Sequence, residues 1–473
     1  MAIKFGTSGW RGVIADDYTV FNVKCVAQAI AEYVIREKQE KEGLIVGYDS
    51  RFLGRQFAEY AARVVSANGV KVLVSKEAVP TPTIAFGIVS GKSAGAINIT
   101  ASHNPYDFNG IKYSPKWGGP ALPETTRWIE DRANEVVSSG KFKEITEEEA
   151  KSKGLWADVD LRPDYLEELN RKIDFGAIKK WGKTVGYDPL FATGSGYLDG
   201  ALAENGIDVI VIHDEVDPYF GGGGPDPSED KLNELSLLVK NDNKIGLGLA
   251  TDGDADRFGI LDFDGTFIEP NYIIALLLDY LIRVRKFEGG VARTVATTHL
   301  IDAVSRYHGV KCYETPVGFK YIGEYISTGE VVGGGEESAG FSIKGHLPEK
   351  DGILACLLTL EMMAVENKSI KELLGELYER VGTFKTRRVN LRLTEALDSA
   401  FPEKMKTDPE SFAGIKVKDK ITIDGTKYIL NDGSWILFRK SGTEPVVRIY
   451  AEAADDKKLE RIIESGREFI LGT

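Results

Sequence analysis

The chain contains little cysteine. Only three occur among its 473 residues, at Cys25, Cys312 and Cys356. They are widely spaced, odd in number and outside any CxxC or zinc-ligand pattern, so we expect reduced thiols in a cytosolic protein. Residues 1–10 hold no apolar stretch, so no secretory signal peptide is expected. The longest apolar run, residues 273–278, is too short to span a bilayer.

Positive charge is also scarce relative to negative charge. There are 59 Lys and Arg residues against 72 Asp and Glu residues, which leaves a formal net charge of −13. This balance repels nucleic acid and anionic membranes in general, so we expect neither as a partner. An anionic substrate would need a local basic pocket. We expect a cytoplasmic globular protein that acts on a small molecule.

A weak internal repeat indicates how the chain is organised. The segment 44–49 is echoed by 183–188, and a third copy begins at Val291. Each of the first two is followed about twenty residues later by a Gly-led strand, as expected of βαβ units. We therefore predict an α/β protein with three similar α/β domains of mixed, largely parallel sheets and a smaller C-terminal α+β domain. The predicted domain ranges are 1–145, 146–250, 251–370 and 371–473.

A serine follows a strand that the sequence predicts in the first domain. Residues 94–99 are small and β-branched, and Asn104-Pro105 forces a turn after them. Ser102 and His103 are therefore expected at the carboxyl end of a strand, where open α/β sheets bind ligands. A serine in that position can act as a nucleophile that carries a phosphoryl group.

Three alternating aspartates follow another predicted strand, residues 245–249. In an extended loop, Asp252, Asp254 and Asp256 would point to one side and offer three hard oxygen ligands to Mg²⁺. Arg257 would place a positive charge beside a phosphate at this loop. An EF-hand is excluded because its sixth and twelfth positions would not be Gly and Glu. An acidic solvated turn remains the alternative.

Two further loops combine glycine with polar side chains that suit a sugar phosphate. In the first, Glu336 and Ser338 follow a Gly-rich strand end and match a pair of vicinal sugar hydroxyls, although a flexible glycine turn is the alternative. In the second, Arg and hydroxyl side chains with free amides predict a phosphate cradle without a P-loop, although an exposed basic hairpin turn is the alternative. The cradle residues are Arg439, Ser441, Gly442, Thr443 and Arg448.

Three more basic side chains stand near these loops in the sequence. Arg11 follows a Gly-rich N-terminal segment and could reach a phosphate, or belong to a plain entry loop. Lys112 follows Ser102 closely, and Lys320 comes from a turn after a strand. No chemistry is assigned to the glycine run 221–225. Because the motif-bearing loops all end strands in different domains, we expect them to meet in one cleft.

These motifs occur in the order found in the α-D-phosphohexomutase family, and the chain resembles that family along nearly its full length. The shared pieces are a Ser-His phosphoserine loop, a DGDADR-type metal loop, a GE-x-S-x-G sugar loop and an R-x-S-G-T-x-P phosphate loop. The resemblance implies four domains, of which the fourth is similar to TATA-binding-protein-like folds. It also implies an isomerase that reversibly converts a hexose 1-phosphate to its 6-phosphate through a bisphosphorylated sugar.

The resemblance also implies a role for each candidate residue, with Ser102 as the phosphoryl carrier and Mg²⁺ and glucose 1,6-bisphosphate as cofactors. The implied metal ligands are Ser102, Asp252, Asp254 and Asp256. The groups around the transferring phosphoryl group are His103, Lys112, Arg11 and Arg257, and the general base among them is left open. The sugar contacts are Lys320, Glu336 and Ser338. The contacts to the phosphate that is not reacting are Arg439, Ser441, Gly442, Thr443 and Arg448.

The loop at Glu336 looks like the phosphoglucomutase version, so glucose 1-phosphate and glucose 6-phosphate are the expected substrates. Mannose-phosphate relatives tend to have Met or Tyr after the Glu and His after the last Gly, and glucosamine-phosphate relatives tend to have Gln after the Glu. This chain has Glu337 after the Glu and Phe341 after Gly340. A phosphomannomutase, a dual-specificity enzyme and a phosphoglucosamine mutase remain the alternatives.

Two rival classes leave part of the pattern unexplained. A metal-dependent sugar phosphatase would use the serine and the metal but has no use for the separate cradle at Arg439. A non-catalytic sugar-phosphate-binding protein has no need of Ser102 beside three carboxylates. The expected partner is therefore a hexose phosphate, and the expected oligomeric state is a monomer or homodimer.

Overall fold

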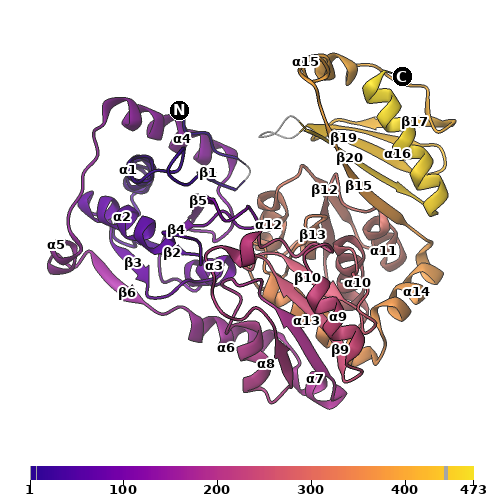
Figure 1. Ribbon diagram of the computed structural model, residues 1–473, viewed down its shortest axis with the longest axis horizontal. Helices are drawn as coiled ribbons and strands as arrows, with labels where there is room; N and C mark the ends of the chain where they lie inside the picture. The colour runs from indigo at the N-terminus through magenta and orange to yellow at the C-terminus, as the bar shows by residue number, and fades with distance from the viewer. Residues whose placement is uncertain (1, 7, 441–445, 473) are drawn as a thin grey trace. The chain divides into compact units, whose positions relative to one another are not determined.

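The structure, a computed structural model, describes residues 2–6, 8–440 and 446–472 (Figure 1). Its internal contacts divide the chain into two units. The first unit comprises Met1–Pro270, Gly323–Glu330 and Ser338–Ile370. The second comprises Asn271–Ile322, Val331–Glu337 and Lys371–Thr473.

The first unit is built on the sheets of two α/β domains. Its strands are β1 (Trp10–Val13), β2 (Leu44–Tyr48), β3 (Val72–Ser75), β4 (Gly95–Ile99), β5 (Phe108–Pro115), β6 (Trp156–Val159), β7 (Thr184–Asp188), β8 (Val209–Val211), β9 (Ile245–Thr251), β10 (Phe258–Leu261) and β14 (Gly340–Ile343). Its helices are α1 (Val20–Arg36), α2 (Gly54–Ala67), α3 (Thr81–Val89), α4 (Pro123–Ser139), α5 (Glu147–Ser152), α6 (Arg162–Lys172), α7 (Phe175–Trp181), α8 (Leu198–Glu204), the 3₁₀ turn η1 (Phe220–Gly222), α9 (Asn233–Asn241) and α13 (Gly352–Glu366).

Both sheets are mixed and largely parallel, as predicted. The first has the order β1-β5-β4-β2-β3-β6, with β1 and β5 antiparallel to their neighbours. The second has the order β10-β9-β7-β8, with only its edge strand β10 antiparallel. Strands β2, β4 and β9 are buried at every position, which explains their unbroken apolar or small-residue sequences. The repeated segments become β2 and β7, each an inner strand of its sheet.

The second unit combines part of a third α/β domain with the C-terminal domain. Its elements are α10 (Pro270–Arg283), β11 (Gly290–Thr294), α11 (Leu300–His308), β12 (Cys312–Thr315), α12 (Phe319–Thr328, which continues into the first unit), β13 (Val331–Glu336), α14 (Ile370–Val381), β15 (Lys385–Arg392), α15 (Glu395–Lys404), β16 (Ser411–Phe412), β17 (Ile415–Ile421), β18 (Thr426–Leu430), β19 (Trp435–Lys440), β20 (Val446–Ala453) and α16 (Asp456–Leu471).

The two parts of the second unit differ in the direction of their strands. Strand β11 is parallel to both β12 and β13. The C-terminal strands form an antiparallel sheet in the order β15-β20-β19-β18-β17-β16, with α16 packed against it (Figure 1). Buried Val295 and Ala296 pack against Trp435, Leu437 and Tyr450, so an apolar cluster joins the two parts. The predicted fold class is therefore confirmed.

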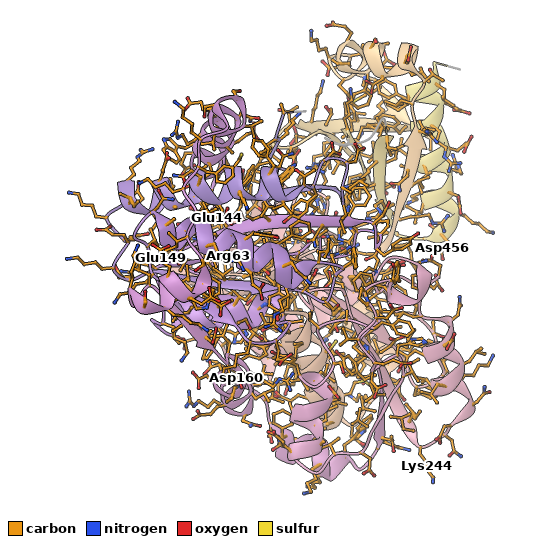
Figure 2. All side chains as sticks on the ribbon, turned by 60° about the vertical axis from the view of Figure 1, so that its left-hand side comes forward. Arg63, Glu144, Glu149, Asp160, Lys244 and Asp456 are labelled. Atoms are coloured by element: carbon orange, nitrogen blue, oxygen red, sulfur yellow. The ribbon has the colours of Figure 1, made fainter. Side chains whose placement is uncertain are left out.

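The surface carries the charge that the composition requires. Figure 2 shows side chains such as Glu149, Asp160 and Lys244 extending away from the ribbon, and all three are exposed. None of the helices in the described part of the chain combines the length and the apolar character that crossing a bilayer requires.

Candidate active site

Ser102 lies directly beyond the carboxyl end of β4, as predicted. We call residues 100–108 the serine loop. The Ser102 amide donates to Thr100 Oγ1 at 2.8 Å, and the Asn104 amide donates to the Ala101 carbonyl oxygen at 3.1 Å. Ser102 has φ 52°, in the left-handed region, which costs a residue other than glycine about 1–3 kcal/mol. Such a conformation persists only where the surrounding contacts enforce it, and Ser102 is 1% exposed.

The three aspartates lie in a tight turn and not in the extended loop that the sequence suggested. We call residues 251–257 the aspartate loop. The Ala255 amide donates to the Asp252 carbonyl oxygen at 3.0 Å, and Ala255 has φ 54°. Alternation along an extended chain is therefore not what aligns the carboxylates. The turn brings them together instead: Asp252, Asp254 and Asp256 are all buried, and each offers an oxygen atom within 4.8 Å of the others.

Ser102 and Asp252 are in direct contact. Ser102 Oγ donates to Asp252 Oδ2 at 2.8 Å, and the Arg257 amide donates to Asp252 Oδ1 at 3.0 Å. Burial and the neighbouring Asp254 and Asp256 raise the pKa of Asp252 well above its usual range. A cation bound among the three carboxylates would relieve this repulsion.

Lys112 contacts the same carboxylates from β5. Its Nζ donates to Asp254 Oδ2 at 2.6 Å and to Asp256 Oδ2 at 3.5 Å. Burial alone would raise the pKa of Asp254, but the charge and hydrogen bond of Lys112 hold it below its usual range. Lys112 is therefore buried against the triad and is not a solvated lysine, and its part in the reaction stays a prediction.

Two oxygen atoms of the triad suit a metal ion. Among the described residues, Asp254 Oδ1 and Asp256 Oδ1 are buried without any hydrogen-bond partner. A buried unpaired oxygen is costly, and an ion is one of the explanations for it. Buried carboxylate oxygens are the donors that hard cations such as Mg²⁺ prefer. The buried triad could therefore hold a metal ion.

His103 and Arg11 lie at the same site. His103 Nδ1 is 3.4 Å from Ser102 Oγ. Burial and the positive charges of Arg257 and Arg11 lower the pKa of His103 well below its usual value, which favours the neutral ring. Arg11, on β1, donates from Nη1 to Asn104 Oδ1 at 2.5 Å and so contacts the serine loop.

Two contacts to the triad escaped the sequence analysis. Lys350 Nζ lies 3.0 Å from Asp256 Oδ2, and Thr81 Oγ1 donates to Asp254 Oδ2 at 2.5 Å. Lys350 directly precedes Asp351, which caps the start of α13 by accepting the Leu354 amide at 2.8 Å. An acidic cap before an apolar helix is a local signal, but nothing local connects it with an aspartate so far away in the chain.

Gly253 allows the serine and aspartate loops to approach each other. A Cβ atom at this position would lie 2.5 Å from the Ser102 carbonyl oxygen and 2.8 Å from Pro225 Cγ. The Gly253 amide also donates to the Pro225 carbonyl oxygen at 3.2 Å. The contact between the two loops therefore depends on glycine between the first two aspartates.

In the second unit, a chain of hydrogen bonds links the sugar loop to the C-terminal domain. Glu336 Oε1, at the end of β13, accepts the Gly318 amide at 2.8 Å. The neighbouring Val317 amide donates to Asp424 Oδ2 at 3.1 Å, and Arg439 Nε donates to Asp424 Oδ1 at 3.0 Å. Asp424 was missed because it stands in a turn between β17 and β18, where Asp-Gly usually signals only a hairpin.

The other predicted contacts to sugar and phosphate divide between the two units. Arg448 on β20 stands directly opposite Arg439 on β19. Like charges opposite each other destabilise a sheet, and a bound anion would offset that cost. Lys320 is nearly buried in the first turn of α12, and Ser338 belongs to the first unit. Ser441, Gly442 and Thr443 lie outside the residues that the structure describes.

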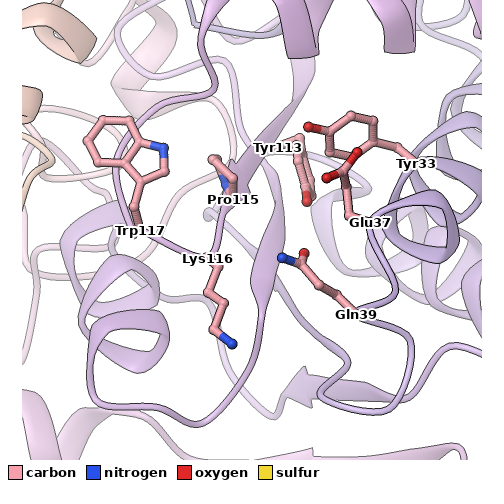
Figure 3. A pocket seen from close by; sticks show the side chains of 7 residues that line it. All are labelled: Tyr33, Glu37, Gln39, Tyr113, Pro115, Lys116 and Trp117. Atoms are coloured by element: carbon pink, nitrogen blue, oxygen red, sulfur yellow. The ribbon is translucent and has the colours of Figure 1, made fainter.

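A surface pocket of about 400 Å³ lies elsewhere on the first unit (Figure 3). Its lining residues are Tyr33, Glu37, Gln39, Tyr113, Pro115, Lys116 and Trp117. Pro115 pairs with Gly95 at the start of β4, whereas the serine loop follows the other end of that strand. The pocket therefore does not belong to the site around Ser102.

Comparison with known protein families covers most of the chain. Four phosphoglucomutase/phosphomannomutase models match in series: alpha/beta/alpha domain I over residues 2–139, domain II over 163–265, domain III over 269–381 and the C-terminal domain over 389–468. The chain belongs to the phosphoglucomutase/phosphomannomutase family. It is thus a member of an enzyme family of phosphohexomutases.

Relatives within this phosphoglucomutase/phosphomannomutase family carry different specificities in their names. A phosphoglucomutase of Komagataeibacter xylinus is 30% identical over 95% of this chain and 87% of its own length. A phosphoglucosamine/phosphogalactosamine mutase of Sulfurisphaera tokodaii is 29% identical over 99% of each chain. The crystal structure of a provisionally named phosphomannomutase from Thermus thermophilus superimposes with a TM-score of 0.86, at 32% identity and with both chains fully covered.

Proposed function

We propose that this phosphohexomutase interconverts glucose 1-phosphate and glucose 6-phosphate through a phosphoserine at Ser102 and glucose 1,6-bisphosphate. The supporting observation is the hydrogen bond from Ser102 Oγ to Asp252, at 2.8 Å, within a buried carboxylate triad. A serine held against a cation site is suited to carry a phosphoryl group. A sugar phosphatase would share this arrangement, but Arg439 and Arg448, opposite each other on β19 and β20, would give a second anion site that a phosphatase does not need.

The proposed reaction has two symmetrical steps. A sugar hydroxyl attacks the phosphorus of phosphoserine, the bond to Ser102 Oγ breaks, and the hydroxyl proton passes to a base on the protein. The bisphosphate then turns over, and Ser102 Oγ gives up its proton and attacks the phosphorus at the other end of the sugar. The bond from that phosphorus to the sugar oxygen breaks, and the released oxygen takes a proton back from the protein. Mg²⁺ bound to Asp252, Asp254 and Asp256 would neutralise charge on the transferring phosphoryl oxygens.

The side chains around Ser102 have matching tasks in this scheme. Lys112, Lys350 and Arg11 supply positive charge that is held in place before the reaction, where it stabilises a phosphoryl transition state best. His103 Nδ1 lies 3.4 Å from Ser102 Oγ, so its ring is placed near the reacting atoms, although its lowered pKa makes it a weak base. The phosphate that is not reacting would bind at Arg439 and Arg448.

Arg439→Ala is expected to raise KM for the hexose phosphate by about 10- to 100-fold, as the loss of a charge-assisted hydrogen bond predicts, with a smaller change in kcat. Steady-state kinetics on both sugar phosphates measure this split. Arg467→Ala is the control, because that side chain is half exposed on α16 and pairs only with Glu464 at 3.5 Å among the described residues. An unchanged KM in the Arg439 variant would contradict the assignment of the cradle.

Gly253→Ala is expected to lower kcat by about 10- to 100-fold, because the added Cβ forces the serine and aspartate loops apart and misplaces the reacting atoms. Gly200→Ala on α8 is the matched control, since its Cβ would meet nothing within 4 Å. Rates of 6-phosphate formation are compared after correction for folded protein. Equal rates in the two variants would show that catalysis does not require this close approach.

The preference for glucose rests on the resemblance of residues 336–340 to the phosphoglucomutase loop. Phe341 was counted in favour of glucose because it stands where mannose-phosphate relatives tend to have histidine. Its ring is fully buried at the start of β14. Mannose and glucosamine phosphates stay as alternative substrates.

One assay tests both the reaction and the sugar. The purified chain is given Mg²⁺, a trace of glucose 1,6-bisphosphate and the 1-phosphate of glucose, mannose or glucosamine, and both the 6-phosphate and inorganic phosphate are measured. Preferred conversion of glucose 1-phosphate supports the whole proposal. A different preferred sugar would overturn the specificity, and release of phosphate without isomer would overturn the reaction.

A further inference from the structure

Arg51 follows the carboxyl end of β2 and binds the backbone of the serine loop. The sequence motifs did not indicate it as a functional residue. Its Nη2 donates to the carbonyl oxygens of Ser102 and Asn104 at 2.5 and 2.6 Å. Its Nη1 donates to those of Pro105 and Phe108 at 2.7 and 3.0 Å. One guanidinium group therefore gathers four carbonyl oxygens of the loop that carries the nucleophile.

Arg51 is itself fixed on its other sides. Its amide donates to Asp49 Oδ1 at 3.0 Å, and its Nε lies 3.2 Å from Asp49 Oδ2, with both side chains fully enclosed. The ring of Phe220 lies 5.0 Å from the guanidinium carbon. An enclosed, paired and stacked arginine has a single orientation, so it can fix the position of what it binds.

The internal repeat shows whether the turn that contains Arg51 needs an arginine in order to form. At the end of β7, Asp188 accepts the Leu190 amide at 2.8 Å, as Asp49 accepts the Arg51 amide at the end of β2. The same turn thus forms in the second domain with leucine in place of arginine. The turn does not require the guanidinium group, which is present only beside the serine loop.

The glycine run 221–225 also packs against this loop. A Cβ on Gly224 would lie 3.1 Å from the His103 carbonyl oxygen, so the two backbones pack closely. Phe220, at the start of the run, is the residue that stacks on Arg51. The serine loop is therefore in contact with both a guanidinium group and a glycine-rich segment of the next domain, and Ser102 within it has a left-handed φ, which persists only where surrounding contacts maintain it.

We propose that Arg51 is a positioning residue for phosphoryl transfer: it holds the carbonyl groups of the serine loop together so that Ser102 Oγ stays directed at Asp252. This inference rests on the proposed function, because it assumes that Ser102 carries the phosphoryl group. Lysine cannot replace arginine here, because its ammonium donates three hydrogen bonds from one nitrogen and not from a planar fork.

The test separates transfer from binding. Dephosphorylated wild type, Arg51→Lys and Arg51→Ala receive labelled glucose 1,6-bisphosphate, and single-turnover uptake of label on Ser102 is timed. We expect uptake to slow by about 100-fold or more in both variants, while the Kd for the bisphosphate changes by less than about threefold. Millimolar guanidinium should raise the uptake rate of Arg51→Ala by at least about tenfold and should leave that of wild type unchanged.

The controls decide what a negative result means. Arg55→Ala removes an exposed arginine in the first turn of α2, paired with Glu59 at 3.0 Å, and should leave uptake unchanged. Thermal unfolding and circular dichroism fix the folded fraction of each variant, and Arg51→Lys serves alone if Arg51→Ala does not fold. Wild type that takes up no label would refute the proposed function. The inference would be overturned if wild type takes up label and Arg51→Lys takes it up at the same rate. It would also be overturned if the variants lose uptake only in proportion to their loss of folded protein.

Discussion

Ser102→Ala is expected to lower kcat by at least about 10⁴-fold, because it removes the only oxygen atom that the proposed route uses to carry the phosphoryl group. Alanine fits the same left-handed φ of 52° no worse than serine, so the fold should survive the change. The loop would lose the 2.8 Å hydrogen bond to Asp252 but keep its four carbonyl contacts to Arg51. Coupled detection of the 6-phosphate measures the rate.

A label separates loss of the carrier from loss of structure. Wild type treated with labelled glucose 1,6-bisphosphate should hold label on protein, and Ser102→Ala should hold none. Ser139→Ala, at an exposed position on α4, is the control and should match wild type in both rate and label. Turnover near the wild-type rate in Ser102→Ala would remove the phosphoserine from the mechanism, whatever sugar the protein uses.

The positions of Ser102 and the aspartates could be predicted because they depend on local sequence. A buried strand reads as an unbroken run of small or apolar residues, and the loop after it lies at the carboxyl edge of the sheet. Strands β4 and β9 end no more than two residues from the predicted points. What local sequence did not give is the shape of the aspartate loop, because the bond between Ala255 and Asp252 has no alternating signature.

The missed residues share a different cause. Arg51, Lys350 and Asp424 act on partners far away in the chain, so their meaning arises only when the domains fold. Arg51 lies two residues after the repeated segment 44–49. The repeat was identified from the residues that the two copies share, whereas Arg51 is a residue in which they differ. A comparison of the copies position by position would have exposed it.

In the C-terminal domain, two elements form against the secondary structure that their local sequence favours. The second half of strand β20 is rich in alanine and glutamate, which favour helix elsewhere. It forms nevertheless because β15 and β19 flank it on both sides. Helix α15 contains Pro402, which normally signals a break. Tertiary pairing prevails over both local signals.

Removal of divalent metal is expected to lower kcat by about 10³-fold or more, and added Mg²⁺ should restore it. The reason is electrostatic: three buried carboxylates lie close together, and Asp254 Oδ1 and Asp256 Oδ1 have no hydrogen-bond partner in the described chain. Without a cation, the transferring phosphoryl group would meet the repulsion of these oxygens. Neutralising such charge is worth several kcal/mol, and each 1.36 kcal/mol is about a factor of ten in rate.

Variants locate the effect at the triad. Asp254→Asn and Asp256→Asn should abolish the response to Mg²⁺, whereas Asp131→Asn, at an exposed position on α4, should behave as wild type. Because an ion that binds only the folded protein stabilises it, Mg²⁺ should also raise the Tm of wild type but not of the triad variants. If EDTA changes neither the activity nor the Tm, the predicted metal ion is not part of the site. Lys112, Lys350 and Arg11 would then have to balance the charge of the phosphoryl group without an ion, although Lys112 and Lys350 are already paired with Asp254 and Asp256.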